Sequence, residues 1–243
     1  MYSILCKNLR QNGYDTITVR DYLESPASGR FAIMRHDVDR TIKNALKMAE
    51  LENRLGIRST YYFRYPYTFE PEIIKKIGGL GHEIGYHYEV LSKARGDYGL
   101  AIRLFESELE KIRKIADVKT ICMHGYPLSK YDNRHIWNKY CFRDFGIIGE
   151  AYLSFRGDAA YLSDTGRTWS SKNKIRDFMP GYKSKDIATT TDNLIRALNK
   201  GNTGNLYILA HPERWGYTRI DGFSGYLRDL VVNAGKKMLV GLR

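Results

Sequence analysis

Carboxylate and imidazole side chains stand at the C-terminal ends of four short stretches of this sequence. The four places are His36-Asp37-Val38-Asp39 after 31–34, His87 at the end of 81–87, His124 after 120–123, and His211 after 206–210. Each stretch has β-strand character, and the C-terminal ends of parallel strands meet at one edge of a sheet or one mouth of a barrel. We therefore expect these side chains to form one metal or catalytic site.

The opening stretch carries two carboxylates with one residue between them. If the chain stays extended there, Asp37 and Asp39 point to the same side, which suits a metal ligand beside a general base. Histidine and aspartate ligands with an open position fit catalytic Zn²⁺, and also Fe²⁺, Mn²⁺ or Co²⁺. The structural alternatives are that Asp39 only caps the next helix and that Asp37 only pairs with Arg35 or Arg40.

The composition is that of a globular protein without a membrane span. The chain has 243 residues, 43% of them hydrophobic and 27% charged, enough for one large α/β barrel or two small domains. No stretch is long and apolar enough for a transmembrane helix, and the start has no signal-peptide pattern. Cys6, Cys122 and Cys141 form no CxxC pair, which favours a reducing compartment and predicts a cytoplasmic protein.

The net charge of +12 favours anionic partners such as phosphate-bearing sugars or an anionic membrane surface. The basic residues are spread along the chain, with no block of five like charges, so no nucleic-acid arm is predicted. Peripheral contact with the inner face of a membrane is compatible with this charge. A basic, solvated surface without a specific partner is the plainer interpretation.

Strands and helices alternate along the chain. The predicted strands are 31–36, 57–64, 81–87, 120–123 and 206–210, with weaker ones at 145–148 and 160–162. The predicted helices are 2–11, 41–55, 71–77, 100–116, 187–199 and 224–235, and the helix at 2–11 is followed by a further short segment at 16–23. A polar loop is expected from 88 to 98. This alternation predicts a parallel α/β sheet or barrel. No linker divides the chain, so we expect one domain over 1–243, with a lead-in at 1–30 and the motif-bearing core at 31–215.

Three of the motifs resemble one enzyme family. Gly81-His82-Glu83-Ile84-Gly85-Tyr86-His87 resembles the metal-binding motif of the polysaccharide deacetylases, the NodB-homology or carbohydrate esterase family 4 group. His36-Asp37-Val38-Asp39 stands where that family has paired aspartates, and Leu209-Ala210-His211 is similar to its closing Leu-x-His motif. The resemblance implies a distorted (β/α) barrel of about seven parallel strands and a metal-dependent hydrolase that removes N- or O-acyl groups from sugars.

The same resemblance implies a role for each motif residue. Asp37 matches the general base, Asp39 the metal-binding acid, His87 the first metal histidine and His211 the general acid. Independently of the family, hydrolysis of an amide or ester needs an activated water, a polarised carbonyl and a protonated leaving group. Asp37 and His211 suit the two proton transfers.

The sequence also departs from the family pattern. Val38 separates the two aspartates, and Leu91 stands where the second metal histidine is expected. The family's Arg-x-Pro-Tyr motif is missing, and His124-Gly125-Tyr126-Pro127 occupies that region. Either His124 replaces the missing ligand or the metal site is degraded. These features are similar to a divergent branch of the family found with surface-polysaccharide (O-antigen) assembly.

Several further side chains are candidates for contact with the substrate. Tyr126 lies in the His124 motif, and Asp164, Arg167 and Trp169 form a compact turn that offers an acid, a cation and an aromatic platform for a sugar. Arg35, Arg40 and Arg214 flank the motifs and suit a phosphate- or lipid-linked substrate. Ordinary surface turns and charge pairs are the alternatives. We expect His82 and His135 to be structural, and Glu89 to be either an acid that orients a ligand histidine or an exposed loop residue.

The sequence thus predicts a carbohydrate deacetylase that acts on a sugar or sugar-linked carrier in surface-glycan (lipopolysaccharide) synthesis. A metal-dependent phosphoesterase or other amidohydrolase would use the same ligands. A catalytically impaired barrel that binds or assembles glycans is the third hypothesis. The sugar, the acyl group, the metal and the oligomeric state are not determined by the sequence.

Overall fold

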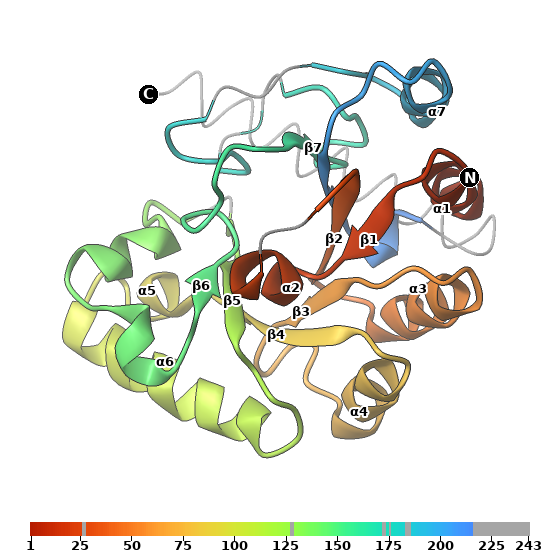
Figure 1. Ribbon diagram of the computed structural model, residues 1–243. Coiled ribbons are helices and arrows are strands. Elements are labelled where there is room, and N and C mark those ends of the chain that lie inside the picture. Colours follow the sequence, from red (N-terminus) through yellow and green to blue (C-terminus); the bar gives the residue numbers. More distant parts are fainter. Residues whose placement is uncertain (26–27, 127–128, 172–173, 175, 183–185, 216–243) are drawn as a thin grey trace.

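The structure is a computed structural model, and it describes residues 1–25, 28–126, 129–171, 174, 176–182 and 186–215. Its centre is a parallel sheet of the expected α/β type, with strands in the order β6-β5-β4-β3-β2-β8-β7 (Figure 1). The strands are β2 (Phe31–Val38), β3 (Thr60–Phe63), β4 (Glu83–Tyr88), β5 (Thr120–Met123), β6 (Gly149–Glu150), β7 (Ala160–Ser163) and β8 (Leu206–Ala210). Every pairing between neighbours is parallel. The predicted parallel fold is therefore confirmed.

The lead-in at 1–30 adds to this sheet. It contains α1 (Tyr2–Gln11), β1 (Asp15–Ile17) and α2 (Val19–Glu24). β1 pairs with the first half of β2, Asp15 opposite Phe31, whereas β3 pairs with the second half, Arg35 opposite Thr60. Residues 15–17 were not predicted as a strand, because three residues are too short for a visible alternation of apolar and polar positions.

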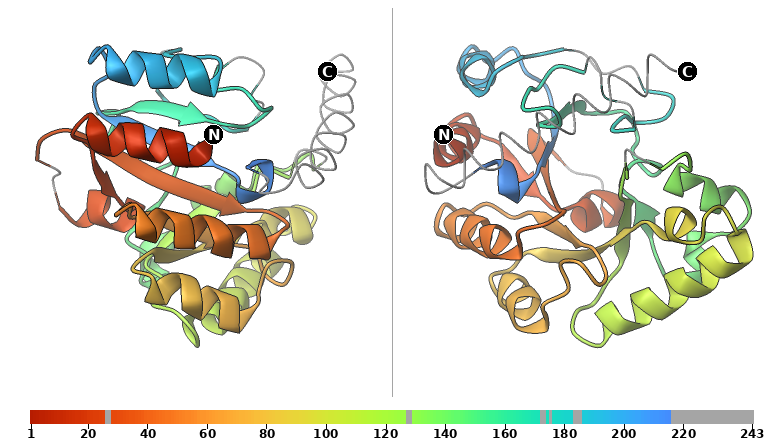
Figure 2. Two further views of the ribbon diagram at one scale, coloured as in Figure 1. Left: turned by 90° about the vertical axis from the view of Figure 1, so that its right-hand side faces the viewer. Right: turned by 180° about the vertical axis from the view of Figure 1, so that it is seen from behind.

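Helices cover the outside of the curled sheet. They are α3 (Ile42–Arg54), α4 (Pro71–Gly79), α5 (Val90–Lys93), α6 (Tyr98–Arg113) and α7 (Thr191–Asn199), with 3₁₀ turns η1 (Asn133–Asn138), η2 (Phe142–Phe145) and η3 (Pro212–Arg214). Figure 2 shows the strand arrows pointing to one side and, in its right-hand view, the face at their tips. None of the described helices is long and apolar enough to cross a membrane.

β2 is buried along its whole length and has two distinct faces. Ala32, Met34 and Val38 pack in the outer core against the helices, whereas Ile33 belongs to the inner core. Because side chains alternate along a strand, Arg35 and Asp37 share the inner face with Ile33. The strand thus delivers Asp37 to the inside of the barrel, and Asp39 follows at its mouth.

The barrel is closed by side chains between its edge strands, β6 and β7. The hydroxyls of Tyr152, after β6, and Tyr161, on β7, both donate to the carboxylate of Asp177. Tyr207 on β8 reaches across the interior to the carbonyl of Ala151, at 3.2 Å. These contacts hold the curled sheet together at β6 and β7, the two edge strands, which do not pair with each other.

Several predicted boundaries are corrected. β2 extends two residues further than expected, so Asp37 lies within the strand. The expected loop at 88–98 contains α5, whose Val90 and Leu91 are buried. The strand expected at 145–148 is wrong, because this segment contains the end of η2 and β6 begins only at Gly149. The helix expected at 224–235 lies outside the described residues.

Candidate active site

Three histidine rings face the carboxylate of Asp39 at the mouth of the barrel. Nε2 of His87 lies 3.3 Å and Nε2 of His124 lies 3.6 Å from Oδ1 of Asp39, and Nε2 of His211 lies 3.9 Å from its Oδ2. Burial by itself raises the pKa of Asp39, but the neighbouring His124, His87 and His211 outweigh burial and hold this pKa well below its usual value. Asp39 is therefore an ionised carboxylate among imidazoles.

The rings of His87 and His124 are fixed through their other nitrogen. Nδ1 of His87 lies 3.0 Å from the carbonyl oxygen of Cys122, and Nδ1 of His124 lies 2.7 Å from Oε2 of Glu89. A ring that donates its proton through Nδ1 presents the lone pair of Nε2, which is the arrangement found in metal-binding histidines. Burial lowers the pKa of His124, which favours this neutral form.

Glu89 anchors His124 and is itself anchored by Arg64. The Arg64 guanidinium donates to both oxygens of Glu89, at 3.0 and 2.9 Å, and to the backbone carbonyl of Asp39 at 2.9 Å. Burial raises the pKa of Glu89, but His124 and Arg64 outweigh it and lower the pKa to about 2. Glu89 is only 3% exposed, so its interpretation as an exposed loop residue is wrong. Its place two residues after the end of the predicted strand 81–87 was the signal for a site residue.

Asp37 lies deeper in the barrel and is held by Arg35. Nε and Nη2 of Arg35 donate to the two carboxylate oxygens at 2.8 and 2.6 Å, and the guanidinium lies 4.2 Å from the ring centre of Tyr152. Burial raises the pKa of Asp37, but Arg35 and His87 outweigh it and the pKa is lowered. Arg35 is fully buried, so the substrate contact predicted for it is corrected: it pairs with Asp37.

His211 is oriented by Asp164. Its Nδ1 lies 2.6 Å from Oδ1 of Asp164, while the backbone N–H of His211 and the indole N–H of Trp215 donate to Oδ2. Arg214 Nη1 lies 2.7 Å from Asp164 and 2.8 Å from His211 Nδ1. An imidazole nitrogen that donates to a carboxylate cannot also accept, so we assign the Arg214 bond to Asp164.

The protonation of His211 follows from these neighbours. Burial and Arg214 lower its pKa, but Asp164 and Asp39 outweigh them and raise it above its usual value. The protonated ring can therefore act as an acid toward a group at Nε2. The sequence did not reveal that Asp164 orients this ring, because the two residues are 47 positions apart and meet only across β7 and β8.

Glu213 is an acidic neighbour that sequence reasoning missed. It lies on η3, two residues after His211, and its Oε2 is buried without a hydrogen-bond partner. Burial and the charge of Asp39 raise the pKa of Glu213 to about 7. The sequence gave no motif for it, since a glutamate after a His-Pro pair is ordinary in a loop.

The residues around Asp39 fit a divalent metal ion. Oδ1 of Asp39 is buried and has no hydrogen-bond partner, although imidazole nitrogens face it. Lone pairs directed at a carboxylate oxygen are unfavourable unless a cation or a proton lies between them. Asp39, His87 and His124 would hold such an ion, with oxygen and nitrogen donors suited to Zn²⁺, Fe²⁺, Mn²⁺ or Co²⁺.

Among the described residues, the one group of three metal-ligating atoms that all lie within 4.8 Å of one another comes from Asp37, His87 and Cys122. We regard it as the weaker candidate. Arg35 already donates to both oxygens of Asp37 and lies 2.7 Å from the sulfur of Cys122. Burial raises the pKa of the Cys122 thiol well above its usual value, which keeps it protonated.

Four of the predicted substrate residues line one cavity of about 180 Å³ beside His211. They are Asp164, Arg167, Trp169 and Arg214. Trp169 is only 3% exposed and donates its indole N–H to Thr191, so its ring is part of the wall rather than an open platform. The carboxylate of Asp164 already binds His211 and the other partners described above, so it orients this ring rather than facing an open site.

Tyr126 and Arg40 lie in more open positions. Tyr126 is 43% exposed, and its ring centre lies 6.1 Å from that of His124. Its φ of 22° is unusual for a residue with a side chain, and Arg176 donates to its carbonyl at 3.0 Å. Arg40 is exposed directly after Asp39. Tyr126 is therefore a predicted contact that is accessible and whose ring lies beside that of His124.

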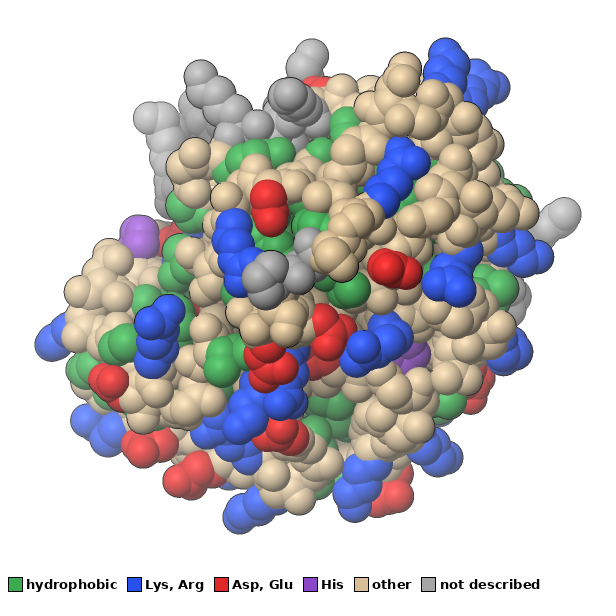
Figure 3. All heavy atoms as spheres, viewed as in Figure 1, with side chains coloured by type: hydrophobic (Ala, Val, Ile, Leu, Met, Phe, Trp, Pro, Cys, Tyr) green, Lys and Arg blue, Asp and Glu red, His purple; other side chains and the backbone are tan. Residues whose placement is uncertain are grey.

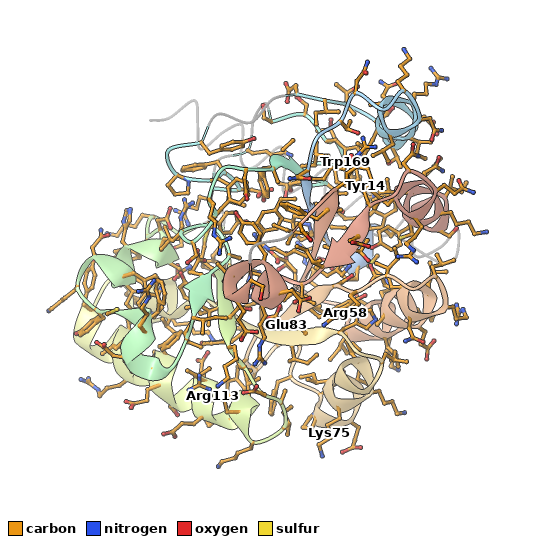
Figure 4. The ribbon with its side chains drawn as sticks, in the orientation of Figure 1. Tyr14, Arg58, Lys75, Glu83, Arg113 and Trp169 are labelled. Atoms are coloured by element: carbon orange, nitrogen blue, oxygen red, sulfur yellow. The ribbon has the colours of Figure 1, made fainter. Side chains whose placement is uncertain are left out.

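A larger cavity, of about 550 Å³, lies at the opposite ends of the strands. Its walls include Arg20, Arg58, Lys75 and Glu83, and Figure 4 shows the last three on the face turned toward the viewer, away from the strand tips. On that face, basic and acidic side chains are interspersed (Figure 3). Arg20 pairs with Glu24 and Asp117, and Arg58 pairs with Asp21. The larger cavity is thus remote from the histidines, and these charges are already paired.

His82, His135 and Leu91 lie away from the carboxylate of Asp39 in sequence and were expected to have no ligand role. His82 lies on the outer side, where Nε2 lies 3.0 Å from the carbonyl of Ala49, as expected for a structural histidine. His135 is exposed on η1. Leu91 is 2% exposed and packs in the inner core, so no polar ligand occupies that position.

Comparisons with known proteins give similarity at the level of the fold. No family model and no curated protein sequence matches the chain. Among solved structures, a family 4 carbohydrate esterase from Bacillus anthracis has a TM-score of 0.45 and 14% identity, covering 82% of this chain and 87% of that chain. A family 4 pseudoenzyme from the same organism has a TM-score of 0.42 and 13% identity, covering 87% of this chain and 66% of that chain. A mutant of a family 4 pseudoenzyme with restored enzymatic activity has a TM-score of 0.42 and 13% identity, covering 88% of this chain and 68% of that chain.

Proposed function

We propose that this protein is a metal-dependent hydrolase that removes an acetyl group from an N- or O-acetylated sugar. One observation carries the proposal. His87, His124 and the protonated His211 all direct Nε2 at Asp39, and the carboxylate of Asp37 lies beside His87. A divalent ion held by Asp39, His87 and His124 would supply Lewis-acid chemistry, which polarises a carbonyl and makes a water more acidic.

The protein's own residues would perform the proton transfers. Asp37 accepts the proton of the attacking water while Arg35 keeps its carboxylate in place. The water oxygen bonds to the acetyl carbon, the bond from that carbon to the sugar nitrogen or oxygen breaks, and His211 protonates the departing atom. Asp164 holds the His211 ring for this step. The products are acetate and the free amino or hydroxyl group of the sugar.

The finer part of the proposal concerns the substrate. The net charge of +12 and the positions of Arg40, Arg167 and Arg214 favour a sugar that carries a phosphate or is linked to a lipid carrier, as in surface-polysaccharide synthesis. Tyr126 offers an exposed ring near the histidines for contact with the sugar face.

Acetate release tests the activity. Purified protein is incubated with N-acetylglucosamine, UDP-N-acetylglucosamine and N-acetylated chitotetraose, before and after treatment with a chelator and after re-addition of Zn²⁺, Mn²⁺ or Co²⁺. We expect metal-dependent acetate release from at least one of these substrates. Phosphate release from p-nitrophenyl phosphate without acetate release would instead identify a phosphoesterase. Metal and glycan binding without either product would identify a binding protein.

A further inference from the structure

Two buried carboxylate oxygens among the described residues have no hydrogen-bond partner, Oδ1 of Asp39 and Oε2 of Glu213. Buried polar atoms in folded proteins are nearly always hydrogen-bonded, and each exception calls for an explanation such as an ion or a water. The two residues are far apart in sequence, in the turn after β2 and on η3 after β8. The sheet pairs these strands side by side, His36 opposite Ala210, which brings both residues to the same end of the barrel.

The two carboxyl groups interact with each other and with the same histidine. The charge of Asp39 acts on Glu213, and His211 acts on both groups. Like charges buried close together are unfavourable unless something compensates them. Arg214 is the nearby cationic side chain, and it donates to Asp164. Oδ1 of Asp39 and Oε2 of Glu213 remain without a hydrogen-bond partner. A cation between Asp39 and Glu213 would satisfy both oxygens at once.

We propose that Glu213 supplies a further carboxylate oxygen to the ion that Asp39, His87 and His124 hold. This inference rests on the proposed function, because it assumes that the ion binds at Asp39. It adds a ligand that no sequence motif indicates. The site then has two carboxylates and two imidazoles, which favours divalent ions with mixed oxygen and nitrogen ligands.

The experiment measures metal binding on the full chain, independently of catalysis. The metal-free wild type, Glu213→Gln and a matched control, Glu108→Gln, are titrated with Zn²⁺ by calorimetry and with Co²⁺ by visible absorption. Glu108 is also a buried carboxylate, but it lies on α6 and is bound by Tyr86 and Lys93. We expect Glu213→Gln to raise the Zn²⁺ dissociation constant at least ~10-fold and to change the Co²⁺ spectrum, because a ligand is lost. Glu108→Gln should leave both unchanged.

Thermal unfolding gives a second readout. In chelator, the two variants should shift the melting temperature in opposite directions relative to wild type. In chelator, Glu213→Gln should melt at a higher temperature than wild type, because it removes repulsion from Asp39. The rise in melting temperature on adding Zn²⁺ should be smaller than in wild type. Glu108→Gln should melt lower in chelator, since it breaks a paired carboxylate, but should keep the full rise with Zn²⁺. A merely structural role for Glu213 predicts lower melting temperatures in both conditions.

The outcomes separate this inference from the proposed function. Wild type that binds no divalent ion overturns both. Wild type that binds Zn²⁺, with unchanged affinity and spectrum in Glu213→Gln, overturns only the role of Glu213. Loss of turnover with unchanged Zn²⁺ affinity would place Glu213 in proton transfer and would also overturn the ligand assignment.

Discussion

At the scale of single residues, the two aspartates of the opening motif have different surroundings. Asp37 is 3% exposed and bonded to Arg35 through both oxygens, whereas Asp39 faces three imidazole nitrogens and has a free oxygen. The inserted Val38 faces the outer core, so both aspartates keep the inner side. The alternative that Asp37 pairs with Arg35 is confirmed, and this pairing is compatible with a catalytic base whose position must be fixed.

The first prediction separates the two aspartates. Asp37→Asn should bind metal as wild type does but lose about 10²–10⁴-fold in turnover, because an amide cannot accept a proton from water. Asp39→Asn should weaken metal binding, since a neutral amide oxygen is a poorer ligand than a carboxylate. Metal content after dialysis and acetate release are measured on both variants. Metal loss in Asp37→Asn together with retention in Asp39→Asn would reverse the two roles.

At the scale of elements, strand ends position the site and buried side chains fix those strands. Gly85 on β4 shows how tightly the interior is filled: a Cβ there would lie 2.3 Å from two ring carbons of Tyr62 and 3.1 Å from the carbonyl oxygen of Thr120. The close approach of β4 to Tyr62 therefore requires glycine. Two residues further on, the same strand presents His87.

The second prediction follows from this packing. Gly85→Ala should destabilise the fold by roughly 1–3 kcal/mol or more through overpacking, and should weaken metal binding because β4 must shift. Gly79→Ala is the matched control, because a Cβ at Gly79, in the last turn of α4, meets nothing within 4 Å. Denaturant unfolding compares the two. Equal stability of both variants would show that the Tyr62 ring moves aside without cost.

Helix α3 is bonded to the sheet through a buried carboxylate, Glu52. It lies 2.8 Å from Nε2 of His36 and accepts hydrogen bonds from Tyr2, Ser59 and Tyr61. Burial raises the pKa of Glu52, but His36 and His82 outweigh it and lower the pKa to about 2, against 4.5 for an unperturbed glutamate. The ionised form is thus stabilised by folding.

The third prediction is a pH dependence with a definite sign. Because the pKa of Glu52 is lower in the folded than in the unfolded protein, its ionisation adds to the free energy of unfolding. This contribution is complete above about pH 4.5 and is lost as the pH falls toward 2. Glu52→Gln should lower the free energy of unfolding at pH 7 by about 3–5 kcal/mol and flatten its decline between pH 4.5 and 2. Urea unfolding across this range measures both effects. An unchanged acid limb in the variant would contradict the assignment.

At the scale of the whole molecule, the positive charge is spread over the surface. Basic and acidic side chains alternate on the face in Figure 3, and Arg40, Arg167 and Arg214 belong to the segments at the other end of the strands. A distributed positive potential attracts anionic ligands over distances that salt shortens. It therefore acts on the approach of the substrate rather than on the chemical step.

The fourth prediction tests that effect. The KM for UDP-N-acetylglucosamine should rise between 0.05 and 0.5 M NaCl, because the Debye length falls to a few Å over this range, about 10 Å at 0.1 M and 3 Å at 1 M. The KM for uncharged N-acetylated chitotetraose should change little, and kcat should be similar throughout for both. The same salt response for both substrates would exclude a role of the charge in binding.

The sequence by itself determined the strand order along the chain and the residues at the strand ends. Stretches predicted as strands preceded Asp37, His87, His124 and His211, and parallel strands present such residues at one end. For this reason the α/β fold and the gathering of these side chains could be predicted from local pattern alone. Short strands such as 15–17 and 149–150 could not be predicted, because their pairing depends on a neighbour elsewhere in the chain.

Only the tertiary structure decided which partners complete the site. The sequence left Arg35 as a substrate contact or as a partner of Asp37, and the inner face of β2 places the two side chains in one ion pair. Asp164 and His211 meet because β7 pairs with β8, a contact with no trace in the local sequence. Charged neighbours then set the protonation of each buried group. Burial raises the pKa of both Glu89 and Glu213, but His124 and Arg64 lower that of Glu89 to about 2, whereas Asp39 helps raise that of Glu213 to about 7.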